Sequence, residues 1–338
     1  MFSPFMPQPA PASDAYADGR CLRVGVLSNP LSGGNKKGGR GVRKVLAEWP
    51  DVMQREAFAP EGVSQALADF ARNGVDLVVI NGGDGTVHAA LTAIGNEGIF
   101  PKPPLLALLC AGTTSMLPRD VGITGSPAAA MARVLEWAKA TDASLVVRPR
   151  QVLRVLRSSQ QAPLFGMFFG AGAICRGIRA FHAGDNALGW RGELMPLFTI
   201  LRMLLRVSFN GHDKDCNSST GTVLDGRPME RRAEFLVLVS TLERLFLGMR
   251  PYWGKETGPL HYTAVSAESK CLLRILVSLL RSQKSCHAIP ENGYFSHNVR
   301  EVQLEFEGDF TLDGELYATG SGPVTITSAG PALFLCLP

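Results

Sequence analysis

A cluster of glycines and one aspartate separates a predicted buried strand from a predicted helix. Residues 77–80 are four apolar residues without polar alternation, which is typical of a strand buried on both faces of a parallel sheet. Residues 87–94 then show helical spacing. Glycines allow the backbone to come close to a ligand, and a helix N-terminus supplies N–H groups and partial positive charge. The corner therefore predicts phosphate binding, with a tight turn closed by Asp84 as the alternative. Its residues are Gly82, Gly83, Asp84, Gly85 and Thr86.

Two further turns follow predicted strands. The strand at residues 22–28 leads into a glycine- and lysine-rich stretch, residues 29–39, which reads equally well as a second ligand loop or as a flexible loop. The strand at residues 105–109 leads into the small residues 110–114. Ligands of such sheets bind beyond the carboxyl ends of the strands, so we expect the three loops to converge.

A late stretch carries two carboxylates around one glycine. Asp313-Gly314-Glu315 lies between apolar runs and by itself predicts a hairpin turn. Together with a phosphate site, however, a carboxylate pair at a strand end could accept a proton from an incoming hydroxyl. The combination points to phosphoryl transfer.

The surrounding elements predict an α/β half followed by a mainly antiparallel half. Helices are expected at 42–49, 63–71 and 127–140, with a strand near 52–58, so a parallel sheet extends to about residue 145. Beyond residue 144 the pattern changes to strand-like runs separated by turns. These runs are residues 145–156, 164–169, 234–240, 262–265, 302–306 and 324–327.

Two apolar helices, residues 194–209 and 271–281, interrupt the second half. Each carries arginines on an otherwise apolar surface. Packing in the core is one interpretation, and contact with a membrane surface is the other. The arginines are Arg202, Arg206, Arg274 and Arg281.

Composition narrows the class of protein. The 338 residues are 46% hydrophobic and 19% charged, with a net charge of +4 and no long basic block, which disfavours nucleic-acid binding. Seven cysteines without a CxxC pair predict reduced thiols in the cytoplasm and no structural zinc. No apolar run approaches the ~18 residues of a membrane span. Residues 1–20, rich in Pro, Ala and Ser at their start, are expected to be a disordered tail.

These motifs, in this order and spacing, resemble the diacylglycerol kinase catalytic family, which includes bacterial soluble lipid kinases, sphingosine kinases and ceramide kinases. The resemblance rests on residues 29–33, 82–86, 112–113 and 313–315 and covers roughly residues 21–338. The glycine motif is shared with NAD kinases, and its pairing with Asp-Gly-Glu points to lipid kinases. The resemblance implies a Rossmann-like nucleotide domain at 21–145 and an antiparallel β-sandwich lipid-substrate domain at 146–321. It also implies that about 322–338 returns to the first domain.

Roles follow from the resemblance position by position. Glu315 would be the general base, Asp313 would support it, and Asp84 would act through Mg²⁺. The other positions would hold the phosphates of ATP: Asn29, Ser32, Gly33, Gly82, Gly83, Gly85, Thr86, Gly112 and Thr113.

Two positions depart from the family's pattern. Met116 stands where an aspartate is usual, with Asp120 four residues later. Residues 252–260 lack the aspartates that hold a structural Mg²⁺ in bacterial members, so a second metal is not expected.

The sequence therefore predicts a cytoplasmic, peripherally membrane-associated, ATP- and Mg²⁺-dependent lipid kinase. Its acceptor would be the hydroxyl of diacylglycerol or a related lipid at the membrane surface, and a homodimer is left open. The alternatives are an NAD kinase-like enzyme and a catalytically degenerate lipid- or nucleotide-binding protein.

Overall fold

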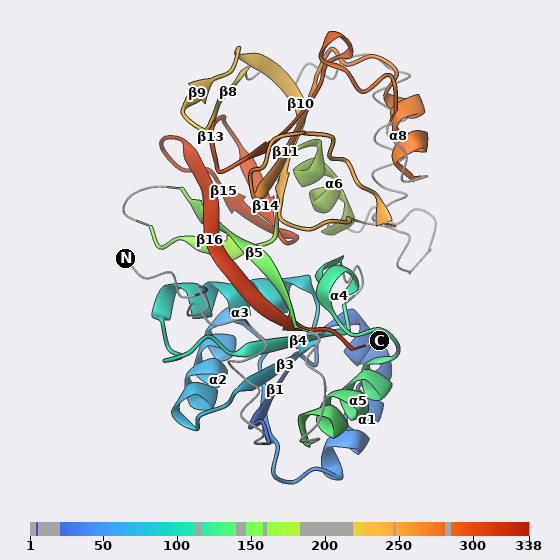
Figure 1. Ribbon diagram of the computed structural model, residues 1–338, viewed down its shortest axis with the longest axis vertical. Helices are drawn as coiled ribbons and strands as arrows, with labels where there is room; N and C mark the ends of the chain where they lie inside the picture. Colours follow the sequence, from blue (N-terminus) through green and yellow to red (C-terminus); the bar gives the residue numbers. More distant parts are fainter. Residues whose placement is uncertain are drawn as a thin grey trace. The chain divides into compact units, whose positions relative to one another are not determined.

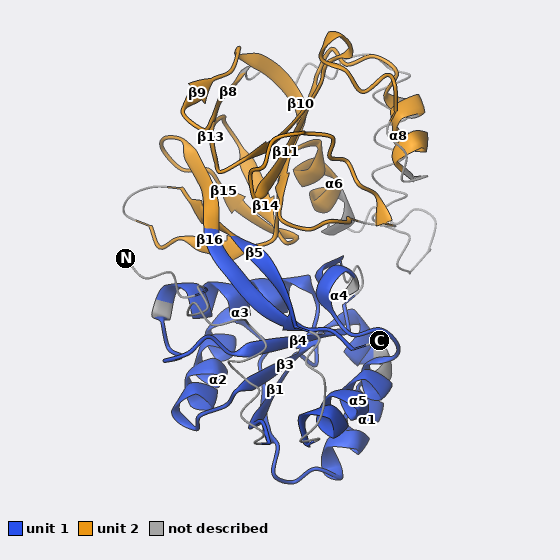
Figure 2. Ribbon diagram, viewed as in Figure 1, with its two compact units in different colours: residues 1–152, 329–338 blue, residues 153–328 orange. Residues whose placement is uncertain are grey.

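The computed structural model divides the chain into two compact units. Unit 1 comprises residues 1–152 and 329–338, and unit 2 comprises residues 153–328 (Figure 2). The structure describes Phe5 and residues 21–112, 116–139, 147–157, 161–182, 219–245, 248–280 and 285–337. The expected tail at 1–20, Phe5 apart, and the expected helix at 194–209 lie outside these residues.

Unit 1 is built on a parallel sheet, as predicted. Its strands lie in the order β4–β3–β1–β2, and the end of β16 (Val324–Leu335) pairs in parallel with β4. Their bounds are β1 Val24–Ser28, β2 Met53–Glu56, β3 Leu77–Gly82 and β4 Leu105–Cys110.

Helices cover both faces of this sheet (Figure 1). On one face α1 and α5 pack on alternate strand residues such as Val26 and Val79. On the other face lie α2 and α3, where Gly25 leaves room for the ring of Phe70. The unbroken apolar strands are thus explained by burial on both sides. The helices are α1 Gly33–Ala47, α2 Pro60–Arg72, α3 Asp84–Glu97, α4 Met116–Val121 and α5 Pro127–Lys139.

The first helix begins earlier than the sequence predicts. We expected a loop through residue 39 and a helix from residue 42, yet α1 starts at Gly33. A Cβ on Gly34 would lie 2.7 Å from the carbonyl oxygen of Ala111, and one on Gly41 would lie 3.1 Å from the Cβ of Ala128. Close packing of the helix against these neighbours requires glycine at both positions. Tertiary contacts therefore outweigh the low helix propensity of glycine.

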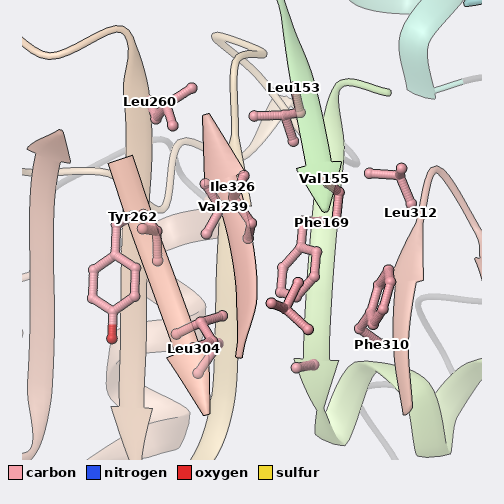
Figure 3. Close-up of a cluster of buried hydrophobic side chains, with 14 of the residues drawn as sticks. Leu153, Val155, Phe169, Val239, Leu260, Tyr262, Leu304, Phe310, Leu312 and Ile326 are labelled. Atoms are coloured by element: carbon pink, nitrogen blue, oxygen red, sulfur yellow. The ribbon is translucent and has the colours of Figure 1, made fainter. Parts of the chain in front are cut away.

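Unit 2 is an antiparallel assembly, which confirms the expected change of architecture. Its strands follow the order β15–β14–β7–β10–β8–β13–β16, and β11 and β12 continue from β10. Their inward-facing side chains form one apolar core, in which Phe169, Phe310 and Leu312 lie together (Figure 3). The bounds are β5 Val147–Leu156, β6 Leu164–Gly166, β7 Phe168–Gly172, β8 Ser219–Leu224, β9 Arg227–Pro228, β10 Arg232–Ser240, β11 Leu260–Ser266, β12 Tyr294–Val299, β13 Glu301–Glu305, β14 Asp309–Leu312 and β15 Glu315–Ala318.

Two helices pack on unit 2. They are α6 (Ala173–His182) and α8 (Leu272–Leu280), the second matching the predicted helix at 271–281. Ile275 of α8 is buried in a small cluster with Phe235 and Tyr294. No helix among the described ranges is long and apolar enough to cross a membrane.

Candidate active site

The predicted phosphate corner is formed where β1 and β3 lead into α1 and α3. The side chain of Asn29 donates to the hydroxyl of Thr86 at 3.0 Å, and the hydroxyl of Ser32 accepts the N–H of Gly83 at 3.1 Å. The two turns that the sequence singled out are therefore joined by their own polar side chains.

Asn35 is a member of this corner that sequence reasoning missed. Its side-chain amide donates to the carbonyl oxygens of Asn29 (2.8 Å) and Asn81 (3.0 Å), which links the ends of β1 and β3. A polar residue one turn after Ser32 was the available signal. It was hidden because that stretch was read as a loop.

The glycines serve close approach rather than unusual backbone angles. Gly83 has φ of −93°, outside the left-handed region. A Cβ there would lie 3.3 Å from the Cα of Gly112, and one on Gly82 would lie 2.6 Å from the Thr86 side chain. Gly82 and Gly85 are likewise not among the described glycines with positive φ. The physical reason for glycine is the contact between turns.

The corner has the electrostatic character of an anion site. The N-caps of α1 and α3 are Ser32 and Gly83, and neither makes a side-chain capping hydrogen bond. The N–H of Gly34 already donates to the carbonyl oxygen of Ala111, and that of Thr86 donates to the carbonyl oxygen of Gly83. The other first-turn N–H groups and the positive ends of the two helix dipoles favour a phosphate group there. Gly33 and Gly85 lie in these first turns, whereas Thr113 lies outside the described residues.

Asp84 connects the corner to the turn after β4. Its two carboxylate oxygens accept the N–H groups of Met116 and Leu117, each at 3.1 Å, at the start of α4. Met116 is buried, with 5% of its surface exposed. Met116, at which the resemblance leads us to expect an aspartate, thus packs in the interior.

A magnesium ion bound with a nucleotide is usually held by one or two carboxylates and the phosphates. The described residues contain no group of three metal-binding side chains. Asp120, the nearby carboxylate, is taken by an ion pair with Arg150 at 3.3 Å.

The second group of predicted residues lies in unit 2, at the β14–β15 hairpin. The expected turn is confirmed, with φ of 50° at Asp313 and 96° at Gly314. Asp313 is 3% exposed, and its carboxylate accepts the N–H groups of Met167 and Phe168 at 2.9 to 3.1 Å. Its own N–H donates to the Phe168 carbonyl. Asp313 is therefore a fixed anchor of the turn.

Gly166 is required for this anchor and was not singled out in the sequence. A Cβ at Gly166 would lie 2.4 Å from a carboxylate oxygen of Asp313. The residues predicted as one strand, 164–169, form two strands, β6 and β7. Met167 lies between them, and its N–H donates to the carboxylate of Asp313.

Glu315 begins β15 directly after this anchored turn and is exposed. It pairs with Leu312 across the hairpin. Two residues later, the pKa of Tyr317 is raised to about 12, first by burial and then by the negative charges of Glu315 and Asp313, against the lowering effect of Arg157. Glu315 is thus accessible and follows a turn that is fixed by hydrogen bonds. A proton acceptor must be accessible in this way.

Comparisons with known proteins relate part of the chain to one family of kinases. Residues 23–146 match the family model of the diacylglycerol kinase catalytic domain, which indicates a kinase. No curated protein matches the chain.

Solved structures share the fold. The crystal structure of a candidate diacylglycerol kinase from Bacillus anthracis str. Sterne is 18% identical, with a TM-score of 0.66, and the alignment covers 94% of this chain and 98% of that one. A structure described as a diacylglycerol kinase from the same organism is 17% identical, with a TM-score of 0.60, covering 94% and 97%. At these identities the likeness shows the two-part α/β and β fold.

Proposed function

We propose that this protein is an ATP-dependent lipid kinase that transfers the γ-phosphoryl group of ATP to the hydroxyl of diacylglycerol or a related lipid. The observation that carries the proposal is the corner between β1, β3, α1 and α3, which lies within the segment that matches the kinase family. Its uncapped helix starts suit phosphate.

The corner would hold the nucleotide through backbone groups and short polar side chains. Phosphoryl transfer needs positioning and neutralisation of charge more than covalent chemistry from the protein. Magnesium, when bound with ATP, would neutralise phosphate charge, and Asp84 would hold it. The proposed phosphate-binding residues are Asn29, Ser32, Gly33, Gly82, Gly83, Gly85, Thr86, Gly112 and Thr113.

The hairpin of unit 2 would supply the acceptor side of the reaction. A lipid hydroxyl is a poor nucleophile at neutral pH, so a carboxylate must take its proton as the new O–P bond forms. Glu315 would be that base. Asp313 would be a positioning residue, because its oxygens are occupied by backbone N–H groups.

The enzyme would meet its lipid acceptor at a membrane surface. Among the described elements, we propose that α8 makes this contact. Val277 is 46% exposed on this helix and Ile289 is 40% exposed after it, beside the exposed Arg274. Apolar side chains with an adjacent cation suit an anionic bilayer surface. This supports peripheral membrane contact, which we propose for an enzyme of the cytoplasm.

The test is Glu315→Gln, assayed with labelled ATP, magnesium and lipid micelles. Gln keeps the shape of Glu but cannot take the proton, so turnover should fall by roughly 10²- to 10⁴-fold. ATP affinity, measured by calorimetry, should stay unchanged.

Glu307→Gln, at another exposed glutamate of unit 2, is the matched control and should turn over like wild type. Equal turnover in Glu315→Gln would refute the base. Failure of the wild type to phosphorylate any lipid would favour the non-catalytic binding protein instead.

A further inference from the structure

Arg157 lies next to the proposed catalytic hairpin. It follows β5, and its guanidinium carbon is 5.3 Å from the centre of the Tyr317 ring. Its Nε is buried, and within the described residues it has no hydrogen-bond partner. A buried donor of this kind loses its water without compensation, so it needs an acceptor from elsewhere.

The surroundings of Arg157 are apolar on one side. Tyr317 stacks on Phe310 with ring centres 5.7 Å apart, and Phe310 stacks on Phe169 at 5.0 Å. The second of these stacks is visible in Figure 3, within the core of unit 2. Phe310 and Phe169 are fully buried, whereas Tyr317 is only partly buried. A group that approaches Arg157 along Tyr317 therefore meets the exposed part of one aromatic ring, which suits a hydrocarbon chain.

Acidic side chains also lie near the Tyr317 ring. Glu315 and Tyr317 are alternate residues of β15 and so face the same side of the sheet. The charges of Glu315, Arg157 and Asp313 all act on the phenol of Tyr317. Arg157 therefore shares the surroundings of the Tyr317 phenol with two carboxylates. It needs a hydrogen-bond acceptor more than it needs another anion.

We propose that Arg157 is a specificity-determining residue that binds the carbonyl oxygen of an acyl ester or amide next to the hydroxyl that Glu315 deprotonates. The inference rests on the proposed function and narrows its substrate class. A carbonyl satisfies the guanidinium and brings an acyl chain toward Tyr317. A neutral carbonyl meets no repulsion from either group, whereas a phosphate would be attracted by Arg157 but repelled by Glu315, and an ammonium would experience the reverse.

The experiment compares acceptors that differ only at this group, in identical neutral micelles. Dioctanoylglycerol carries ester carbonyls, and its dialkyl ether lacks them. Wild type should prefer the ester in kcat/KM. Arg157→Gln should lower kcat/KM for the ester by roughly 10- to 100-fold, the range for a hydrogen bond to a charged group, mainly through KM. The ether and the KM for ATP should be unaffected.

Arg157→Lys should recover part of the ester preference, because it keeps a donor but not the planar fork. Arg231→Gln is the matched control, since Arg231 pairs with Glu305 at the surface of the same unit. An unchanged ester-to-ether ratio in Arg157→Gln would overturn the proposal, even if wild type is an active kinase. So would an effect confined to an acceptor that carries a phosphate.

A second readout separates this inference from the proposed function. Binding of dioctanoylglycerol and its ether without ATP is measured by calorimetry in wild type and Arg157→Gln. Loss of the ester preference on substitution would support the role of Arg157, even if no lipid were phosphorylated. Equal binding of both lipids by wild type would overturn it.

Discussion

At the residue scale, Asp84 shows how one carboxylate can serve both structure and chemistry. Its oxygens accept the N–H groups of Met116 and Leu117, so it fixes the start of α4 against the phosphate corner. The role proposed for it toward magnesium would use the remaining lone pairs of the same oxygens. Two substitutions can separate these roles.

Asp84→Ala should lower the free energy of unfolding by about 1–2 kcal/mol, the usual cost of a lost helix cap, and should abolish turnover. Asp84→Asn keeps one acceptor oxygen but loses the negative charge. It should lose clearly less stability than the alanine variant, yet still lack magnesium-dependent turnover. Urea unfolding and a magnesium titration of activity measure the two effects. Full turnover in Asp84→Asn would contradict the metal role.

At the scale of elements, the paired strands β10 and β11 join the carboxyl group of Glu234 to a tyrosine hydroxyl. The hydroxyl of Tyr262 donates to Glu234 at 3.4 Å, and the ladder shifts register between Glu234 and Leu236. Burial raises the pKa of Glu234 from 4.5 to about 7. The sheet therefore holds a proton that an exposed glutamate would release.

This raised pKa makes stability depend on pH in a definite direction. Between about pH 4.5 and 7 the folded state keeps a proton that the unfolded chain has lost, so the free energy of unfolding falls as pH rises. Glu234→Gln should remove this loss and gain at most about 3 kcal/mol relative to wild type above pH 7. Urea unfolding across this range, with Glu307→Gln as control, measures it. An identical pH slope in Glu234→Gln and wild type would contradict the assignment.

At the scale of the whole molecule, the proposed reaction draws on both units. Unit 1 carries the phosphate corner, and unit 2 carries Glu315 and the exposed side chains around α8. The chain passes from one unit to the other within β5 and again within β16. Binding of the enzyme to a lipid surface would then depend on unit 2.

Val277→Glu should therefore weaken sedimentation with anionic vesicles by roughly 10-fold, because an exposed apolar side chain is replaced by a charge of the membrane's own sign. ATP affinity should not change. Phe58→Glu is the matched control, since Phe58 is 59% exposed but belongs to unit 1. If wild type fails to sediment at low salt, or if both variants bind alike, α8 is not the membrane contact.

The sequence by itself determined the architecture of each half, and it predicted the residues at which we propose the chemistry takes place. Unbroken apolar strands and amphipathic helices specify a parallel sheet buried on both faces, because burial follows from local pattern. The turn at Asp313-Gly314 was predictable for the same reason, since this dipeptide favours the left-handed backbone that a two-residue hairpin needs.

Only the tertiary structure decided which residues support the site. The start of α1 at Gly33, the bridge made by Asn35, the space left by Gly166 and the unpaired Nε of Arg157 depend on contacts between segments far apart in the chain. Local pattern carries no record of such neighbours. A glycine needed for close approach looks the same in sequence as a glycine in a loop, and an arginine is assigned to the surface until its surroundings are known.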